Sequence, residues 1–177
     1  IFRMYNDGVA YRFVSTSKNP FRVKSEQVVF NFPADYKAYI PYVRENRTDS
    51  FEEQFFNSFE NLYTCDSLSA WDKKKYAFMP LLIEAANGKK ICLTEADLIN
   101  YPGMYLYNGD GSNSLKGVFA PYPKEVKQGG HNELQMLVQS RENYIADYDK
   151  GIEFPWRTVI IAENEIPEHV DYSKATL

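Results

Sequence analysis

The chain has 177 residues, of which 44% are hydrophobic and 25% are charged, so its composition excludes a disordered chain and allows one domain with a sizeable core. Its net charge is −4 and its lysines and arginines form no block, which argues against duplex DNA or an anionic membrane surface as a partner. No apolar run approaches the roughly 20 residues that a membrane-spanning helix needs, so no membrane span is predicted.

The first half of the chain favours short strands. Residues 1–5 and 9–14 predict a β-hairpin, because Asp7-Gly8 supplies the backbone conformation that a tight hairpin turn requires. A third strand is predicted over residues 28–32 and a fourth over residues 36–43, where Pro41 suggests a position at the edge of a sheet. Apolar residues alternate on both arms of the hairpin, which is the pattern of a half-buried sheet.

The middle of the chain is less regular. Phe51, Phe55, Phe59 and Leu62 fall near helical spacing, so this segment is either a short helix or a loop anchored by aromatic side chains, and the pattern leaves both open. Residues 71–75, which contain three lysines, are expected to form a solvated connection between elements.

Residues 78–84 and 90–98 predict the clearest hairpin, with Asn87-Gly88 at its turn. Side chains alternate between the two faces of a strand, so Ile91, Leu93, Glu95 and Asp97 share one face. Glu95 therefore continues an apolar row that faces the core. A buried carboxylate costs several kcal/mol, as an order of magnitude, unless it is paired or binds a metal, so Glu95 is a candidate functional residue.

Further strands are predicted over residues 104–107, 115–120, 134–140 and 158–162, with a turn at 108–111 and a flexible connection at 128–131. Strands do not alternate with helices of ten to fifteen residues, which disfavours a parallel sheet. The fold class predicted from this order is an all-β antiparallel sandwich.

Catalytic motifs are missing from the chain. It contains neither a Gly-x-Ser-x-Gly nucleophile motif nor a glycine-rich phosphate loop. His131 and His169 have no neighbour at metal-ligand spacing, and acidic pairs such as Glu52-Glu53 and Glu163/Glu165 are expected to be solvated. The two cysteines, Cys65 and Cys92, could pair or stay free, and we expect both to be small buried residues.

Four blocks of sequence together resemble one protein family. They are "FRMYNDGVAYRF" from Phe2, "FNFPADYKAYIPY" from Phe30, "LTEADLINYPGMYL" from Leu93 and "FPWRTVIIAEN" from Phe154. In this order they resemble the N-terminal domain of glycoside hydrolase family 97, which includes Bacteroides α-glucosidases. The resemblance does not extend to the tail from Ile166 to Leu177.

The resemblance implies a galactose-mutarotase-like β-sandwich that is incomplete at its N-terminus and fills residues 1–177 as a single domain. It further implies a catalytic (β/α)8 barrel elsewhere in the protein, so no catalytic residue is assigned to this chain. In such enzymes the sandwich packs on the barrel and contributes a glutamate to a calcium ion beside an α-linked oligosaccharide. Glu95 matches that glutamate, Asp97 is a weaker candidate, and Tyr101 is the candidate for a residue near the substrate. Family members work in the periplasm or outside the cell.

Three alternatives for Glu95 remain open at this point, namely calcium ligation, an ion pair with an arginine such as Arg12 or Arg141, and exposure to solvent. Two functions also remain open for the chain as a whole. It is either the non-catalytic domain of an α-glucosidase or α-galactosidase, or a free-standing carbohydrate-binding sandwich without hydrolase activity. If a barrel covers this domain, an apolar surface rich in Tyr and Phe should surround Glu95.

Overall fold

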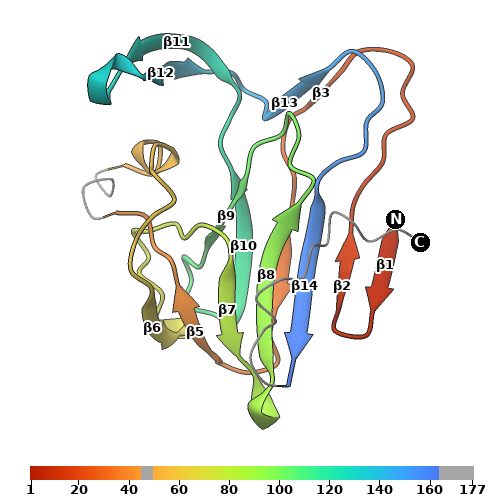
Figure 1. The fold of residues 1–177 in the computed structure, drawn as a ribbon, viewed down its shortest axis with the longest axis vertical. Coiled ribbons are helices and arrows are strands. Elements are labelled where there is room, and N and C mark those ends of the chain that lie inside the picture. Colours follow the sequence, from red (N-terminus) through yellow and green to blue (C-terminus); the bar gives the residue numbers. More distant parts are fainter. Residues whose placement is uncertain (45–49, 164–177) are drawn as a thin grey trace.

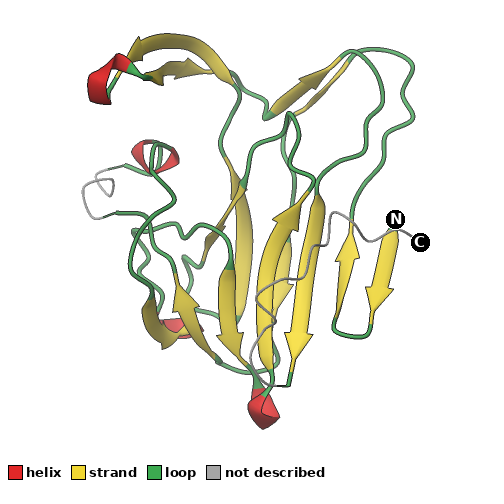
Figure 2. Ribbon diagram, in the orientation of Figure 1, coloured by secondary structure: helices red, strands yellow, loops and turns green. Residues whose placement is uncertain are grey.

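The computed structural model describes residues 1–44 and 50–163. In these residues the chain forms strands and short 3-10 turns, and no α-helix (Figure 2). Every pair of neighbouring strands in the described residues is antiparallel. The all-β antiparallel class predicted from the sequence is therefore confirmed.

The largest element is a seven-stranded sheet with the order β1-β2-β14-β8-β7-β5-β6 (Figure 1). Its strands are β1 (Phe2–Tyr5), β2 (Gly8–Tyr11), β14 (Trp156–Ala162), β8 (Lys90–Ala96), β7 (Leu81–Glu84), β5 (Lys37–Ile40) and β6 (Thr64–Ser67). A second sheet, of order β4-β10-β9, lies behind it and contains β4 (Val29–Asn31), β10 (Ser114–Phe119) and β9 (Met104–Tyr107). Their facing side chains form the main core, which includes Ile83 and Leu93 from the large sheet and Leu106 and Leu115 from the small one.

Two two-stranded ribbons extend from one end of this sandwich, the upper end in Figure 1. One ribbon pairs β11 (Pro123–Gly129) with β12 (Gln135–Arg141), and the other pairs β3 (Phe21–Val23) with β13 (Ala146–Tyr148). The sequence did not predict β3, β6, β11 or β13. The predicted flexible connection at 128–131 is instead the end of β11 and a 3-10 turn, η5 (His131–Glu133), which closes the first ribbon.

The segment of residues 51–62, for which the sequence allowed either a helix or a loop, is a loop. It contains one 3-10 turn, η2 (Glu53–Phe55), and aromatic rings hold it in place. Phe51 stacks on Tyr76 at 4.7 Å between ring centroids, and Phe55 meets Tyr105 edge-on at 5.4 Å. Gln54 is fully buried and fixes the turn further, because it accepts the Tyr76 N–H at 2.7 Å and donates to the Lys74 carbonyl at 2.8 Å.

Two predictions, about the position of β5 in its sheet and about the solvation of residues 71–75, were wrong. Strand β5 is not an edge strand, because it pairs with both β6 and β7; Pro41 lies just after it, where its missing N–H disturbs no ladder. Residues 71–75 are not uniformly solvated, because Trp71 is buried against Tyr42 and its indole N–H donates to the Lys75 carbonyl at 3.0 Å.

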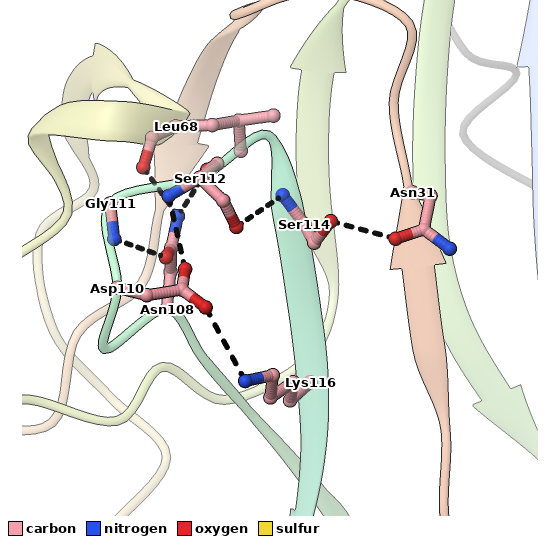
Figure 3. A network of polar contacts seen from close by, with 8 residues as sticks. All are labelled: Asn31, Leu68, Asn108, Asp110, Gly111, Ser112, Ser114 and Lys116. Atoms are coloured by element: carbon pink, nitrogen blue, oxygen red, sulfur yellow. Dashed lines mark hydrogen bonds and ion pairs between the residues drawn. The ribbon is translucent and has the colours of Figure 1, made fainter.

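A polar network closes the turn between β9 and β10 (Figure 3). Asn108 is buried, its amide donates to the carbonyls of Leu68 and Ser112 at 2.8 and 2.7 Å, and it accepts the Gly111 N–H at 2.9 Å. Asp110 accepts the Ser112 N–H at 3.1 Å, and the hydroxyl of Ser112 together with this N–H lowers the pKa of the Asp110 carboxyl to about 2. One asparagine thus joins the turn to the segment before Trp71.

Candidate functional site

Glu95 lies near the C-terminal end of β8, at the upper end of the large sheet in Figure 1. It shares a face with Leu93, which is 1% exposed, and the Glu95 side chain itself is only 10% exposed. The prediction that this carboxylate faces the core is therefore confirmed. The same alternation places Arg157 of β14 beside it, because Glu95 and Arg157 are register partners across the two strands.

Both carboxylate oxygens of Glu95 have a partner. Arg157 donates from Nη1 to Oε1, and the Met104 backbone N–H donates to Oε2 at 2.8 Å. Of the three alternatives left open by the sequence, the structure has the ion pair, but neither Arg12 nor Arg141 is the partner. Arg12 binds Asp97 and Arg141 binds Glu52. Arg157 is the partner of Glu95 because the register of β14 places it opposite Glu95 on β8.

A second carboxylate holds the other side of the same guanidinium. Glu26, in the loop between β3 and β4, accepts two hydrogen bonds from Arg157. Nε donates to Oε1 at 3.0 Å and Nη2 donates to Oε2 at 2.7 Å. Tyr101 donates its hydroxyl to Glu26 Oε2 at 2.8 Å. We call Glu26, Glu95, Tyr101 and Arg157 the Arg157 cluster; all four side chains are at most about a tenth exposed.

Burial and charge oppose each other within the Arg157 cluster. Burial raises the pKa of the Glu95 carboxyl, while the Arg157 charge and the Met104 N–H act in the opposite direction. Burial also raises the pKa of Tyr101, and Glu26 adds to that effect. Burial by itself lowers the pKa of Arg157, but its contacts with Glu26 and Glu95 outweigh this and raise it. With both carboxyls ionised, the cluster carries one negative charge in excess.

Asp97 lies just beyond β8 and binds a different arginine. Its backbone has φ +58°, its carbonyl accepts the Ile99 N–H at 3.0 Å, and its carboxylate accepts Arg12 Nη1 at 2.9 Å. Arg12 is buried, also binds Glu153, and lies over the Trp156 ring at 4.4 Å. Asp97 thus shapes the turn, as expected, and forms an ion pair as well.

The Tyr101 ring is buried, but the residue also borders a surface cleft. Tyr101 packs edge-on against Phe119 and Phe154, at 6.0 and 5.5 Å between ring centroids. The adjacent cleft, of about 650 Å³, has Tyr122, Tyr148 and Arg141 among its lining residues. Whether Tyr101 lies near a substrate stays a prediction.

Some of the exposed apolar side chains lie in segments at the same end of the sandwich, while others, such as Met4 and Leu134, lie elsewhere. Phe13 follows β2 and is 59% exposed, Leu98 and Ile99 follow β8, and Tyr122 borders the cleft. Phe13 is joined to the loop before β14 by the hydrogen bond from the Phe154 N–H to its carbonyl at 3.0 Å. This surface is partly aliphatic, whereas we expected mainly Tyr and Phe.

The Arg157 cluster fits a calcium ion only in part. A carboxylate oxygen can accept two contacts and each oxygen of Glu95 has one, so the donor chemistry allows one ligand from this residue. Calcium takes six to eight oxygens, and the described ranges contain no group of three or more His, Cys, Asp or Glu side chains placed to hold a metal. Glu95 can therefore supply one ligand, and the others would have to come from outside these residues.

The remaining candidates from the sequence do not converge on a site. His131 is exposed on η5, Glu52 binds Arg141, and Glu163 is 84% exposed; His169, Glu165 and the tail lie outside the described residues. Cys65 is exposed, contrary to our expectation, and Cys92 is half-buried. Both are free, because β5 and β7 lie between their strands, and three strand spacings of roughly 4.8 Å exceed the reach of a disulfide.

Sequence reasoning missed Glu26 and Arg157. Arg157 could have been found, because it precedes Val159 and Ile161 at alternate positions of an apolar strand, the same signal that identified Glu95. Glu26 lies in a loop without periodicity, so its sequence holds no comparable signal. Among the described residues no helix has the length and apolar character to cross a bilayer.

The fold and this site define a β-sandwich domain that presents a buried carboxylate at one end. Residues 1–168 match the family described as Glycosyl-hydrolase 97 N-terminal. The chain is also 51% identical, over 164 residues, to a protein of Bacteroides thetaiotaomicron named retaining alpha-galactosidase. That alignment covers 93% of the chain and 25% of the relative, so the chain spans about a quarter of the relative's length. The chain therefore belongs to the N-terminal domain family of glycoside hydrolase family 97.

Solved structures agree with this fold. A glycoside hydrolase family 97 enzyme from a Pseudoalteromonas species, in complex with acarbose, superposes with a TM-score of 0.63 at 17% identity. A beta-arabinopyranosidase superposes with a TM-score of 0.67 at 18% identity. Each superposition covers 92% of this chain, and 20% and 24% respectively of the other chain.

Proposed function

We propose that this chain is the non-catalytic N-terminal domain of a retaining α-galactosidase and completes the active site of a separate catalytic barrel. The observation that carries the proposal is the 51% identity to a retaining alpha-galactosidase over nearly the whole chain. An α-galactoside is therefore the favoured substrate class, ahead of an α-glucoside.

The packing of this domain on a barrel is supported by the end of the sandwich that carries Glu95. Phe13, Leu98 and Ile99 are exposed there, in the segments that follow β2 and β8. A barrel covering this end would bury these side chains. It would also enclose Glu95, whose carboxylate lies just inside the same surface.

Glu95 is proposed to contribute one carboxylate oxygen to a calcium ion shared with the barrel. Support comes from the excess negative charge of the Arg157 cluster and from the free acceptor position on each Glu95 oxygen. Bound calcium would supply a fixed positive charge that polarises groups at the reacting bond. This chain's own residues hold the carboxylate and keep water from its inner side. The family resemblance also leads us to propose a periplasmic or extracellular location.

The complete enzyme tests this proposal. It should hydrolyse nitrophenyl α-galactoside and release galactose in the α configuration first, as followed by proton NMR. The chain of residues 1–177 alone should show no turnover. Turnover that stays with the purified chain through successive columns would contradict the non-catalytic role, and activity on α-glucosides alone would contradict the assigned sugar.

The alternative of a free-standing carbohydrate-binding sandwich rests on the cleft beside Tyr101, whose lining includes Tyr122 and Tyr148. Exposed aromatic rings with neighbouring polar groups can hold a sugar. The chain alone would then bind α-galactosides in calorimetry, and Tyr122→Ala would abolish the binding. Under the proposed function the chain alone binds them no better than this variant does.

A further inference from the structure

Arg157 is the most enclosed charged side chain at the Glu95 end of the sandwich, with 1% of it exposed. Three of its nitrogens are used: Nε and Nη2 bind Glu26, and Nη1 binds Glu95. The two contacts with Glu26 form a parallel fork, which fixes the plane of the guanidinium as well as its position.

The guanidinium is held in place without help from Glu95. Its carbon lies 5.0 Å from the centre of the Phe119 ring and 5.8 Å from that of Tyr101. The Tyr101 hydroxyl in turn binds Glu26, so the carboxylate that holds the fork is itself fixed. Arg157 thus presents Nη1 to Glu95 from a rigid support.

Glu95 is then held between two fixed donors. Arg157 Nη1 meets one of its oxygens, and the Met104 N–H, at the first residue of β9, meets the other at 2.8 Å. A glutamate has three rotatable side-chain bonds, and these two donors together select one arrangement of them. Neither contact uses the last acceptor position of either oxygen.

We propose that Arg157 is a positioning residue for Glu95, and that Glu26 is its anchor. Glu26 fixes the guanidinium, and the guanidinium aims the Glu95 carboxylate so that its remaining acceptor positions face the adjoining domain. The functional meaning of this aim rests on the proposed function, in which Glu95 binds a cation. In the opposite role Arg157 would compete with the cation for Glu95. It would then occupy the cation's place and have to leave Glu95 before the cation binds.

The complete enzyme carrying Arg157→Lys separates the two roles. Lysine keeps the charge but cannot bind Glu26 through a fork while also reaching Glu95. The matched control is Arg12→Lys, because Arg12 is also buried and also binds two carboxylates, Asp97 and Glu153, but does not contact Glu95. Glu26→Gln is a second variant that leaves Arg157 in place and weakens only the anchor.

The first measurement needs no calcium. Hydrogen–deuterium exchange at the Met104 amide, in the presence of a chelator, reports whether the Glu95 carboxylate still accepts that N–H. We expect exchange to become about tenfold faster in Arg157→Lys, faster to a smaller degree in Glu26→Gln, and unchanged in Arg12→Lys. Exchange in Arg157→Lys that matches the Arg12→Lys control would overturn the proposal.

The second measurement is a calcium titration of the same proteins by calorimetry. Residues that orient a metal ligand typically change affinity by roughly 10-fold to 100-fold, so Arg157→Lys should weaken binding about tenfold. Tighter binding in this variant would identify a competitor and also overturn the proposal. If Glu95→Gln binds calcium as the parent does, the metal part of the proposed function fails, and the Met104 exchange still decides the positioning role by itself.

Discussion

Glu95 shows how a single buried carboxylate can be stable within the sandwich. Arg157 and the Met104 N–H each satisfy one of its oxygens, which offsets the cost of removing the charge from water. The sequence located this residue through the two-residue period of a strand. It could not name the partner, because the pairing of β8 with β14 is a long-range feature that joins residues 62 positions apart.

Substitution of Glu95 by glutamine should destabilise the folded chain. The variant loses a charged acceptor while Arg157 keeps Glu26, so we expect the free energy of unfolding to fall by about 2 kcal/mol. Urea denaturation followed by tryptophan fluorescence measures this difference. The control is Glu53→Gln, at an exposed position, and an equal stability change in the two variants would show that the Arg157 contact contributes nothing.

At the scale of elements, the hairpin of β7 and β8 followed from its sequence, whereas the loop around η2 did not. Hairpins carry a local signal, since the turn and both strands lie within about 20 residues. The loop is ordered by contacts with distant rings such as Tyr76 and Tyr105, and these exist only after the sheets have formed. Strands β3 and β13 pair only with each other, far apart in the sequence, so no local turn marks either of them.

The turn between β9 and β10 should depend on Asn108. Alanine at this position removes three hydrogen bonds and leaves the Leu68 carbonyl, the Ser112 carbonyl and the Gly111 N–H without this partner (Figure 3). We expect a loss of about 3 kcal/mol in the free energy of unfolding, since unsatisfied buried groups retain their desolvation cost. Chemical denaturation measures it, with Asn19→Ala, on an exposed segment, as the control; a loss as small as that of the control would contradict this role.

At the scale of the whole molecule, the antiparallel sandwich could be predicted because the order of short strands and turns excludes a parallel sheet. The order of strands within the large sheet could not, and the misplacement of β5 at an edge shows why. Proline indicates that a ladder hydrogen bond is absent, but Pro41 lies one residue beyond the strand, and only the three-dimensional pairing reveals that. The proposed function followed from family resemblance more than from any local motif.

The buried tyrosines predict how the whole fold responds to alkali. Burial raises the pKa values of Tyr42, Tyr76 and Tyr105 from 10.0 to about 12 each. The folded chain therefore keeps protons that the unfolded chain releases, so this part of the stability is complete below pH 10 and is lost as the pH rises towards 12. A titration of tyrosinate absorbance should show late-ionising groups followed by unfolding, and simple titration of every tyrosine near pH 10 would contradict the burial of these rings.

The central proposal is that this domain contributes Glu95 to a calcium site completed by the rest of the protein, and calorimetric titration of the complete protein with calcium tests it most directly. We predict that Glu95→Gln weakens calcium binding at least about tenfold, while Asp97→Asn, in the turn after β8 where Asp97 binds Arg12, binds as the parent does. Equal affinity of the parent and Glu95→Gln would contradict the account.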